Sequence, residues 1–417
     1  MQRGLRLLLA GELLTTSSAL AVQTALGWEG FARSGDPLVL GLIGLSEFVP
    51  ALALALPAGH AADHRDRRFV TAFGLVLIMV ATALIAFDTA AGDQRVWPLY
   101  ALAVFIGIGQ TYASPAFGPM LAAAVPTEEL PRVMAMNASV WQFGTIAGPI
   151  AAGLLHVVGA PAPFVVSALV AGAGAVCVLA VPAVIGRAHL SDEPRSATLA
   201  DALEGVRFIF RSPALLGTMS LDLVAVLLGG ATALLPVFSD EVLHVGALGN
   251  GILRAAPGAG AVVVALLLTA RPLNRRVGPT LFLAVAAFGA FTVVFALSSS
   301  YLLSLAALAG LAGADMLSVF IRSTLSPLLT PPELRGRVGA VERIFIGGSN
   351  ELGAFESGVA AALLGAVPAV AIGGILAIAA AAFWAWRFPQ LRGIDGFEDA
   401  VKLSPAGSTA PSPSPSP

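Results

Sequence analysis

The chain has 417 residues, of which 57% are hydrophobic and only 12% are charged. Soluble domains carry roughly 25% charged residues, so this composition excludes a protein whose main solvent is water. The formal net charge of −2 offers no basic excess of the kind that nucleic-acid binding requires. The single cysteine, Cys177, excludes a disulfide framework and a multi-cysteine metal site. The five histidines are scattered along the chain, and we expect no metal and no cofactor.

Twelve apolar runs follow one another along the chain, each close to the roughly 20 residues that a helix needs to cross a bilayer. The runs of the first half are residues 5–28, 38–58, 69–87, 97–117, 133–157 and 162–184. The runs of the second half are residues 214–237, 249–270, 280–297, 301–325, 338–364 and 367–386. The sequence therefore predicts an all-α membrane protein with twelve transmembrane helices.

The basic residues indicate how these helices are oriented. Lys and Arg are retained on the cytoplasmic side during membrane insertion. Of the 23 Lys and Arg residues, 18 fall in the termini and loops that an even number of spans places on one side, and only Arg33 and Arg95 fall in loops on the other side. We therefore expect both termini to be cytoplasmic.

The longest polar break, residues 186–213, divides the chain into two halves of six spans. The halves repeat each other, because Glu-Leu-Pro-Arg-Val at 129–133 follows the fourth span and Glu-Leu-Arg-Gly-Arg-Val at 333–338 follows the tenth. Parallel six-helix repeats place a substrate site near the midplane between the halves. We predict a six-helix half over 1–186, a cytoplasmic linker over 187–213 with an interfacial helix at 199–211, a second six-helix half over 214–387, and a cytoplasmic tail over 388–417 whose Pro- and Ser-rich end is disordered.

The ten residues between the second and third spans, 59–68, form a motif of their own. Gly59, Asp63 four residues later and the basic pair Arg67 and Arg68 predict a constrained cytoplasmic turn. The motif resembles the signature loop between helices two and three of the major facilitator superfamily, with histidine at position 64 in place of the usual basic residue and aspartate at position 66 in place of the usual glycine. The resemblance implies that these four residues form a gate.

The fifth predicted span carries Gly144, Gly148, Pro149 and Gly153. Small residues four and five apart let helix backbones approach closely, and the proline kinks the helix. The order of these residues resembles the antiporter motif of the same superfamily, which is associated with exporters, although Ala152 replaces its penultimate glycine. At the aligned place in the second half there is no proline.

Two segments of the second half resemble one branch of the superfamily more closely. They are Gly-Ile-Leu-Arg-Ala-Ala-Pro at 251–257 and Ser-Asn-Glu-Leu-Gly-Ala-Phe-Glu-Ser-Gly at 349–358. Both resemble the enterobactin-exporter and macrolide-efflux-like transporters. The resemblance covers nearly the whole chain up to the tail and implies an exporter of the drug and proton antiporter kind.

Charged residues within the spans are costly in lipid and invite a functional explanation. Deep acids are candidates for carrying a coupling proton, because a low dielectric favours a neutral carboxyl. The candidates are Asp222, Glu351, Glu47 and Glu356, with Arg254 as a cation near Asp222 or Glu351 that returns the acid to its charged form. A permanent buried ion pair without a role in transport is the alternative. The remaining charges are predicted to form a structural salt-bridge cluster: Asp315, Arg322, Glu342 and Arg343.

Four polar residues, Gln23, Gln110, Tyr112 and Gln142, are candidates for lining a cavity of mixed polarity, although helix packing explains each of them equally well. No Gly-x-x-x-x-Gly-Lys-Ser/Thr sequence is present, which argues against ATP hydrolysis. We identify no catalytic residues and expect no enzymatic activity.

Together these features predict a secondary active transporter, a proton-coupled exporter of an amphipathic small molecule, either drug-like or a siderophore, that works by alternating access. Its expected partners are the substrate, protons and the lipid bilayer, without nucleic acid, and we expect a monomer. The resemblance is to bacterial proteins and implies a multi-pass protein of the bacterial inner membrane. Two alternatives stay open: an importer or lipid flipper on the same fold, and a polytopic membrane enzyme or sensor without transport.

Overall fold

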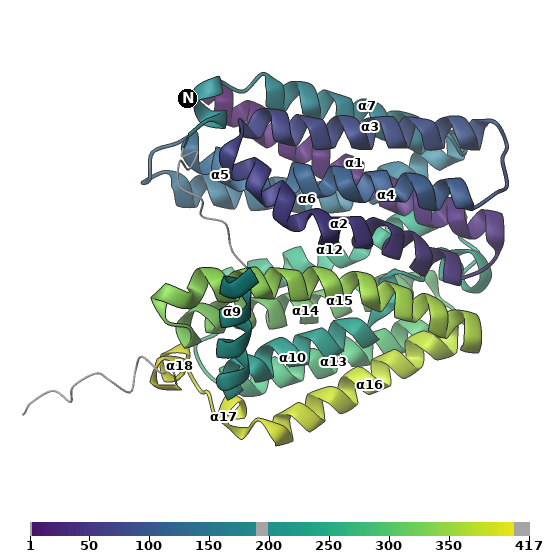
Figure 1. Ribbon diagram of the computed structural model, residues 1–417. Helices are drawn as coiled ribbons and strands as arrows, with labels where there is room; N and C mark the ends of the chain where they lie inside the picture. Colours follow the sequence, from purple (N-terminus) through teal and green to yellow (C-terminus); the bar gives the residue numbers. More distant parts are fainter. Residues whose placement is uncertain (1, 189–198, 404–417) are drawn as a thin grey trace, which may run out of the picture.

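The structure is a computed structural model that describes residues 2–188 and 199–403. Two bundles of helices lie against each other, the first formed by the N-terminal half of the chain and the second by the C-terminal half (Figure 1). Within the described residues the chain forms helices, turns and loops but no β-strand. The far end of the predicted disordered tail, residues 404–417, lies outside the described residues.

The first bundle contains six long helices and three short ones. The fourth passage is composite, because Pro115 in a 3₁₀ turn separates two α-helical pieces and proline cannot donate a helical hydrogen bond. The elements are α1 (Gln2–Ser34), α2 (Leu38–His64), α3 (Arg67–Ala90), α4 (Trp97–Ala113), η1 (Ser114–Ala116), α5 (Phe117–Ala123), α6 (Leu130–Val158), α7 (Ala162–Leu179) and α8 (Ala183–Gly186).

The second bundle repeats this plan after α9 (Leu199–Arg211), a helix that occupies the residues predicted for the interfacial helix. Its first passage breaks at Gly229 and continues through short helical turns. The elements are α10 (Pro213–Leu228), η2 (Gly230–Thr232), α11 (Leu235–Val237), η3 (Phe238–Val242), α12 (Gly246–Ala270), α13 (Val277–Leu297), α14 (Tyr301–Leu329), η4 (Pro332–Leu334), α15 (Arg335–Leu364), α16 (Ala366–Arg387), α17 (Pro389–Arg392) and α18 (Phe397–Leu403).

Ten segments of the described chain are long and apolar enough to cross a bilayer, counting Pro213–Val242 as one. The two other long helices fall short for physical reasons. α4 has only 17 residues and completes its passage through η1 and α5, whereas α15 has 30 residues but carries six charged ones. With these two, the predicted all-α architecture of twelve transmembrane helices is confirmed.

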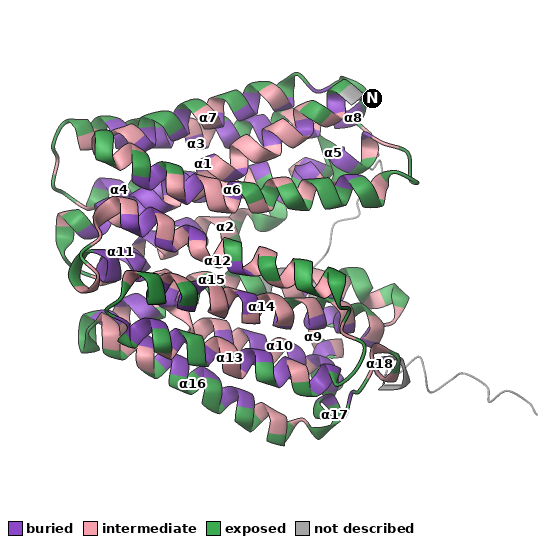
Figure 2. Cartoon of the chain, turned by 180° about the vertical axis from the view of Figure 1, so that it is seen from behind, coloured by how far each residue is buried: buried purple, intermediate pink, exposed green. Residues whose placement is uncertain are grey.

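The outer faces of the bundles expose large apolar side chains, and the contacts between helices bury small and apolar ones (Figure 2). Phe87, Leu169 and Leu302 are 74%, 69% and 76% exposed. In water each such side chain would be unfavourable by about 25 cal/mol per Å² of apolar surface. Lipid removes this cost, and this distribution of side chains therefore fits a protein whose belt faces a membrane.

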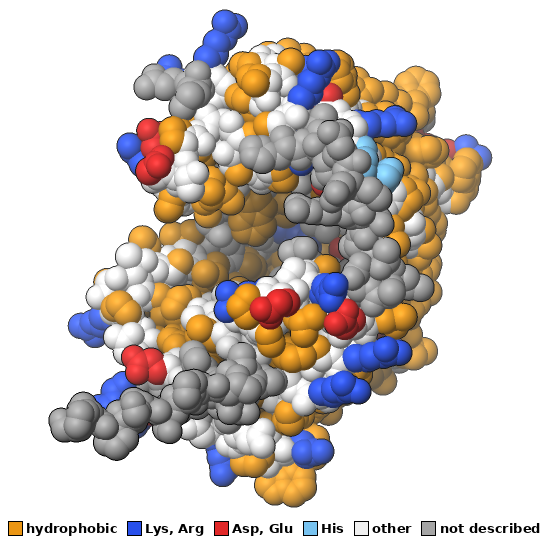
Figure 3. Space-filling model, turned by 60° about the vertical axis from the view of Figure 1, so that its left-hand side comes forward, with side chains coloured by type: hydrophobic (Ala, Val, Ile, Leu, Met, Phe, Trp, Pro, Cys, Tyr) orange, Lys and Arg blue, Asp and Glu red, His pale blue; other side chains and the backbone are white. Residues whose placement is uncertain are grey.

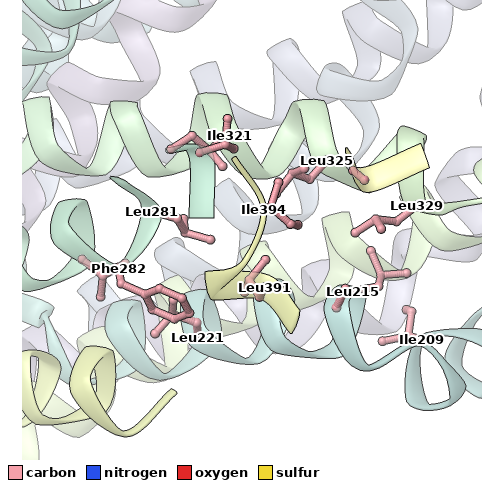
Figure 4. Packing of buried hydrophobic residues seen from close by; sticks show 14 of the residues in the cluster. Ile209, Leu215, Leu221, Leu281, Phe282, Ile321, Leu325, Leu329, Leu391 and Ile394 are labelled. Carbon is pink, nitrogen blue, oxygen red and sulfur yellow. The ribbon is translucent and has the colours of Figure 1, made fainter. Parts of the chain in front are cut away.

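The segment after α16 folds back beneath the second bundle. Leu391 and Ile394 are fully buried in one hydrophobic cluster with Leu281 of α13 (Figure 4). The backbone N–H groups of Val277 and Gly278 donate to the carbonyls of residues 395 and 394 at 3.0 and 2.9 Å. The predicted cytoplasmic tail therefore begins as an ordered part of the second bundle that fixes the loop between α12 and α13.

Candidate functional site

A cavity of about 320 Å³ lies between the two bundles, toward the end of the molecule where α2 and α12 begin. The first bundle contributes α1 and α2, and the second contributes η2, α11, α12 and α15. This volume lies within the range of small-molecule sites, about 300–1,000 Å³. The polar residues of its lining are Gln23, Thr24, Glu47, Thr232, Asn250, Arg254, Asn350 and Glu351.

Arg254 connects the two bundles inside this cavity. Its Nη2 donates to Oε1 of Gln23 on α1 at 2.8 Å, and its Nη1 donates to the carbonyl of Thr232 at 2.9 Å. Both partners are neutral, so these hydrogen bonds fix the guanidinium without cancelling its charge. Glu47 and Glu351 are the acids close enough to interact with it electrostatically. Arg254 therefore shares one site with Glu351, one of its two predicted partners, and with Glu47.

The two carboxylates reach the cavity from opposite bundles. Glu47 of α2 is 9% exposed. Oε2 of Glu351 lies 3.0 Å from the position that a β-carbon on Gly44 would take, so a larger residue at position 44 would displace it. Within the described residues, neither carboxylate accepts a hydrogen bond. With two acids and one guanidinium, the cavity has a net formal charge of −1 when both carboxyls are ionised, and it retains free acceptors for a ligand.

A second, apolar pocket of about 440 Å³ adjoins the polar cavity. Glu47 and Glu351 line both spaces, so the two meet at the carboxylates. Phe48, Leu52 and Leu56 of α2 form much of the apolar wall. A polar chamber with acidic groups at its junction to an apolar pocket suits a molecule with a polar head and an apolar body.

The bundles touch at the end where α2 and α12 begin, which we call the closed end. A β-carbon on Gly41 of α2 would lie 2.9 Å from Cα of Phe355 on α15. A β-carbon on Gly251 of α12 would lie 2.4 Å from the carbonyl oxygen of Pro149 and 3.0 Å from Cα of Gly153 on α6. These backbone contacts permit only glycine and seal the closed end on both sides of the cavity.

Apolar packing reinforces the closed end. Phe31 of α1 and Leu40 of α2 are buried in the same cluster as Leu234 and Phe238 of the second bundle. Because these side chains come from both bundles, separating the bundles at this end would expose them. The closed end is thus held by close backbone contact and by a shared hydrophobic core.

The opposite end, where α2 and α12 finish, is open. Apart from the backbone of the same helix turns, no described atom lies within 4 Å of the position of a β-carbon on Gly59 of α2 or on Gly336 and Gly347 of α15. Figure 3 shows the surface hollowed between the two bundles on the side of the molecule that carries the N-terminus. The structure therefore exposes the cavity to the side on which the sequence places the cytoplasm.

The four residues of the antiporter-like motif join α6 to two different helices. β-Carbons on Gly144 and Gly148 would clash with α1, at 2.9 Å from Cβ of Thr16 and 2.5 Å from the Ser17 carbonyl oxygen. Gly153 and the Pro149 carbonyl instead face α12 of the other bundle. The motif therefore lets α6 pack closely on α1 in its own bundle and on α12 across the closed end.

Asp222 does not face the cavity. Its carboxylate forms an ion pair with Arg322 of α14, whose Nε also donates to Oγ of Ser318 at 3.2 Å. Of the two acids predicted to lie near Arg254, Glu351 does so and Asp222 does not. The reason is that α10 directs Asp222 into its own bundle while α12 directs Arg254 toward the midline. Asp315, on the same helix as Arg322, lines a space of about 10 Å³ together with Asp222 and Ser318.

The other predicted site residues are dispersed. Glu356 is exposed on α15 and is outside the cavity lining. Gln23 lines the polar cavity, and Gln110 lines the apolar pocket. Tyr112 packs edge-to-face on a phenylalanine of α3, and Gln142 donates to a carbonyl of α12 at 3.1 Å. The last two residues therefore serve helix packing in this conformation.

The loop between α2 and α3 is shorter than predicted. α2 continues through Gly59 and Asp63 to His64, and α3 begins at Arg67, so only two residues lie outside the helices. A ten-residue turn over 59–68 is therefore wrong. A lone glycine costs a helix only about 1 kcal/mol, and the alanines around it continue α2. Asp63 is exposed and makes no hydrogen bond or ion pair with any described residue.

The arginines and Asp66 fasten this loop to the segment that follows α7. Arg67 and Arg68 donate to the carbonyls of residues 188 and 181, each at 2.7 Å. Asp66 accepts the N–H, Nε and Nη2 of Arg68 and Nε of Arg187. Burial acts to raise the pKa of Asp66, but these hydrogen bonds outweigh it and hold the pKa below its ordinary value.

We expect Asp66→Ala to loosen the first turn of α3 and to lower stability by about 1 kcal/mol, the usual loss for an N-cap. The pKa of Asp66 is lower in the folded protein than in the unfolded chain, where it is about 3.9. The carboxylate therefore contributes fully to the free energy of unfolding above about pH 3.9, and this contribution is lost only as the pH falls through the lower folded pKa. Hydrogen exchange of residues 67–70 in the wild type should therefore show no protonation step between pH 5 and 8. Asp63→Ala is the matched control, and an equal effect in that variant would contradict this role for Asp66.

Several residues of the site are not predicted from the sequence. Asn250, Asn350 and Thr232 line the cavity but were not singled out, although each is a polar residue within an apolar run. Asp66 was read only as a departure from a motif. Its position immediately before a helix is a recognisable N-cap signal, and this signal identifies the acid that fixes the loop.

Known proteins agree with this architecture. A POT family transporter in complex with a thioalcohol-conjugated peptide is 13% identical over 93% of this chain and 96% of its own, with a TM-score of 0.73. A bacterial homologue of the human lysosomal transporter Spinster, inward-facing and unoccupied, is 14% identical over 98% of each chain, with a TM-score of 0.70. At these identities the likeness shows the fold alone.

Curated relatives match over shorter stretches. Macrolide efflux protein A of Streptococcus pyogenes is 22% identical over 147 residues, 35% of this chain and 36% of the relative. Probable anion transporter 1, chloroplastic, of Oryza sativa subsp. japonica is 30% identical over 146 residues, 35% of this chain and 26% of the relative. The match thus spans only 36% and 26% of the length of these two relatives.

The sequence profile of the Major Facilitator Superfamily matches residues 8–354, most of both bundles. Two six-helix bundles, a cavity between them and the resemblance of the α2–α3 and α6 motifs agree with this match. The chain is a multi-pass membrane protein that belongs to the Major Facilitator Superfamily, a family of transporters.

Proposed function

We propose that this protein is a proton-coupled exporter of amphipathic small molecules that carry a cationic group. The observation that carries the proposal is the junction of a polar cavity and an apolar pocket at Glu47 and Glu351. Two carboxylates without hydrogen-bond donors favour a cationic head group, and the apolar wall of α2 favours a hydrophobic body. Macrolide efflux protein A, a distant relative, supports export as the direction.

The proposed cycle alternates between the two ends of the bundles. The open end faces the cytoplasm in this proposal, with both termini on that side of a bacterial inner membrane. Substrate enters there, and the cavity is exposed on the other side once the contacts at Gly41 and Gly251 separate and the open end closes. Protons entering from outside neutralise deep acids, for which Glu47, Glu351 and Asp222 are our candidates, and thereby release the substrate.

The test is transport by the full chain in proteoliposomes with an imposed pH gradient, using tetraphenylphosphonium as a lipophilic cation. Glu47→Gln and Glu351→Gln are each expected to reduce uphill flux by about tenfold or more, because a hydrogen bond or contact to a charged group is worth about 1.5–3 kcal/mol. Glu356→Gln removes an exposed carboxylate from the same helix as Glu351 and should leave the flux unchanged. Equal losses in all three variants would contradict a cavity-specific role.

One observation favours an anionic substrate instead. Arg254 is the cation of the described cavity lining, and the rice relative is named as a probable anion transporter. Arg254→Gln separates the two readings, because it removes the group that an anion would bind. An anionic substrate would be favoured by two results together. The wild type would transport phosphate but little tetraphenylphosphonium, and Arg254→Gln would lose the transport of phosphate.

A further inference from the structure

An apolar groove of about 580 Å³ lies on the second bundle, away from the cavity between the bundles. α12, α13 and α14 form its walls. Leu283 and Val263 at its edges are 69% and 55% exposed, so the groove opens onto the face that lipid covers. Thr280 is the one polar side chain among its 14 lining residues.

Small residues create the groove. A β-carbon on Gly260 of α12 would lie 1.9 Å from the carbonyl oxygen of Ala309 on α14, so the two backbones are in direct contact there. Gly310 lies beneath the ring of Phe291, and Gly313 faces α12. Because positions 260, 310 and 313 are all glycine, no side chain fills the space above the contact between the α12 and α14 backbones, and the surface is hollow there.

The groove extends toward a cationic loop. Thr280 lies in the first turn of α13 and its N–H donates to the Arg276 carbonyl at 2.9 Å, while Val264 is six residues, about 9 Å at 1.5 Å per residue, from the end of α12. The loop between these helices carries Arg271, Arg275 and Arg276, all exposed. This end of the groove is therefore strongly basic.

The hydrogen-bond partners of these arginines differ from those of the arginines in the corresponding loop of the first bundle, between α2 and α3. Arg67 and Arg68 donate to carbonyls of the chain itself. Among the described residues, the side chains of Arg271, Arg275 and Arg276 meet only one acid, Asp395, which lies 3.7 Å from Nε of Arg275. Their donors are available, and their excess of positive charge is not explained by packing.

We propose that the groove binds an anionic phospholipid. One acyl chain lies over the backbone contact of α12 and α14, and the phosphate is held by guanidinium groups of Arg271, Arg275 and Arg276. Basic residues beside a membrane attract anionic lipids, and guanidinium groups bind phosphate oxygens through paired hydrogen bonds. The Thr280 hydroxyl lies between these two parts and can donate to an ester oxygen. Charge complementarity thus selects the head group, and the groove selects a lipid over a soluble phosphate.

The experiment uses the full-length protein in detergent, titrated with phosphatidylglycerol, phosphatidylcholine or soluble glycerol phosphate. Retained lipid is counted by native mass spectrometry, and the thermal unfolding midpoint is measured in parallel. Two variants test the two parts of the site: the triple change Arg271→Gln, Arg275→Gln, Arg276→Gln, and the groove-filling change Ala287→Phe. The controls are Arg65→Gln, an exposed arginine of the α2–α3 loop, and Ala83→Phe, an exposed alanine of α3.

We expect the wild type to retain phosphatidylglycerol and to be stabilised by it, with little effect of phosphatidylcholine or glycerol phosphate. The triple variant should weaken retention by about 100-fold, because roughly 1 kcal/mol is lost for each of its three arginines. Ala287→Phe should weaken retention as well, because its ring occupies the groove, and each control should behave as wild type. No preference for the anionic lipid, or unchanged retention by Ala287→Phe, would overturn the proposal. Stabilisation by glycerol phosphate equal to that by the lipid would overturn it too, because the groove would then contribute nothing.

Discussion

Replacing Gly251 with leucine is expected to abolish transport. A β-carbon at this position would lie 2.4 Å from the carbonyl oxygen of Pro149, a backbone atom that cannot rotate away. The side chain would wedge α12 from α6 and destabilise every state in which the closed end is sealed. Overpacking of this kind costs about 1–3 kcal/mol, enough to shift an equilibrium between two states by roughly 5- to 150-fold.

The measurement is a distance between spin labels at Val157, at the end of α6, and Leu243, just before α12, in a Cys177→Ala background. The variant should show a longer distance and no uphill flux, while its thermal unfolding midpoint stays near that of the wild type. Gly118→Leu is the control, because no described atom beyond its own helix turn lies within 4 Å of a β-carbon there. An unchanged distance, or wild-type flux, would show that this contact is no part of the gate.

Much of this fold was predictable because a membrane imposes its thickness on the sequence. Ten of the twelve apolar runs correspond to segments long and apolar enough to cross a bilayer, and an eleventh corresponds to the broken passage of α4, η1 and α5. α15 is the exception, with six charged residues, and it was recognisable because those charges are separated by apolar and small residues. The repeat of the motifs at 129–133 and 333–338 then fixed the division into two bundles.

The α2–α3 loop was less predictable. Gly59 and the charges after it are typical of a turn, yet α2 extends to His64. The energy that decides such a boundary is small, about 1 kcal/mol for a glycine, and the anchoring of Asp66 by Arg187 comes from a segment 121 residues away. Local sequence carries no information about that contact.

The identity of the charged residues in the site was predictable from the sequence, but their contacts with one another were not fully predictable. Glu47, Glu351 and Arg254 were recognisable because a charge in an apolar run is costly. Their association was not, since a helix that is apolar on nearly every side gives no indication of which face meets which neighbour. The same ambiguity produced the wrong partner for Asp222, which the fold turns toward Arg322.

The ion pair of Asp222 and Arg322 leads to the other large expected effect. If Asp222 carries the coupling proton, Asp222→Asn fixes its neutral form and leaves Arg322 with Asp315 as its remaining neighbouring acid. This variant should bind substrate and exchange it downhill but lose uphill, pH-driven export. Arg322→Gln leaves the carboxylate of Asp222 buried without its partner. Breaking a buried pair in this way costs about 3–5 kcal/mol, so this variant should express poorly and unfold at lower temperature.

The double variant Asp222→Asn, Arg322→Gln separates coupling from structure. Removing both charges should restore expression and the unfolding midpoint in either case, because neither charge is stranded. The control pairs Asp222→Asn with Arg254→Gln. Any loss of expression or of the unfolding midpoint caused by Arg254→Gln should persist in this pair, since Arg254 interacts with Glu47 and Glu351 instead. Proton-driven flux in proteoliposomes then decides the role of Asp222. Continued absence of uphill export in the well-folded double variant is the result expected of a proton carrier, whereas full coupled export would reduce the pair to a structural salt bridge and leave Glu47 and Glu351 as the acids that couple transport to protons.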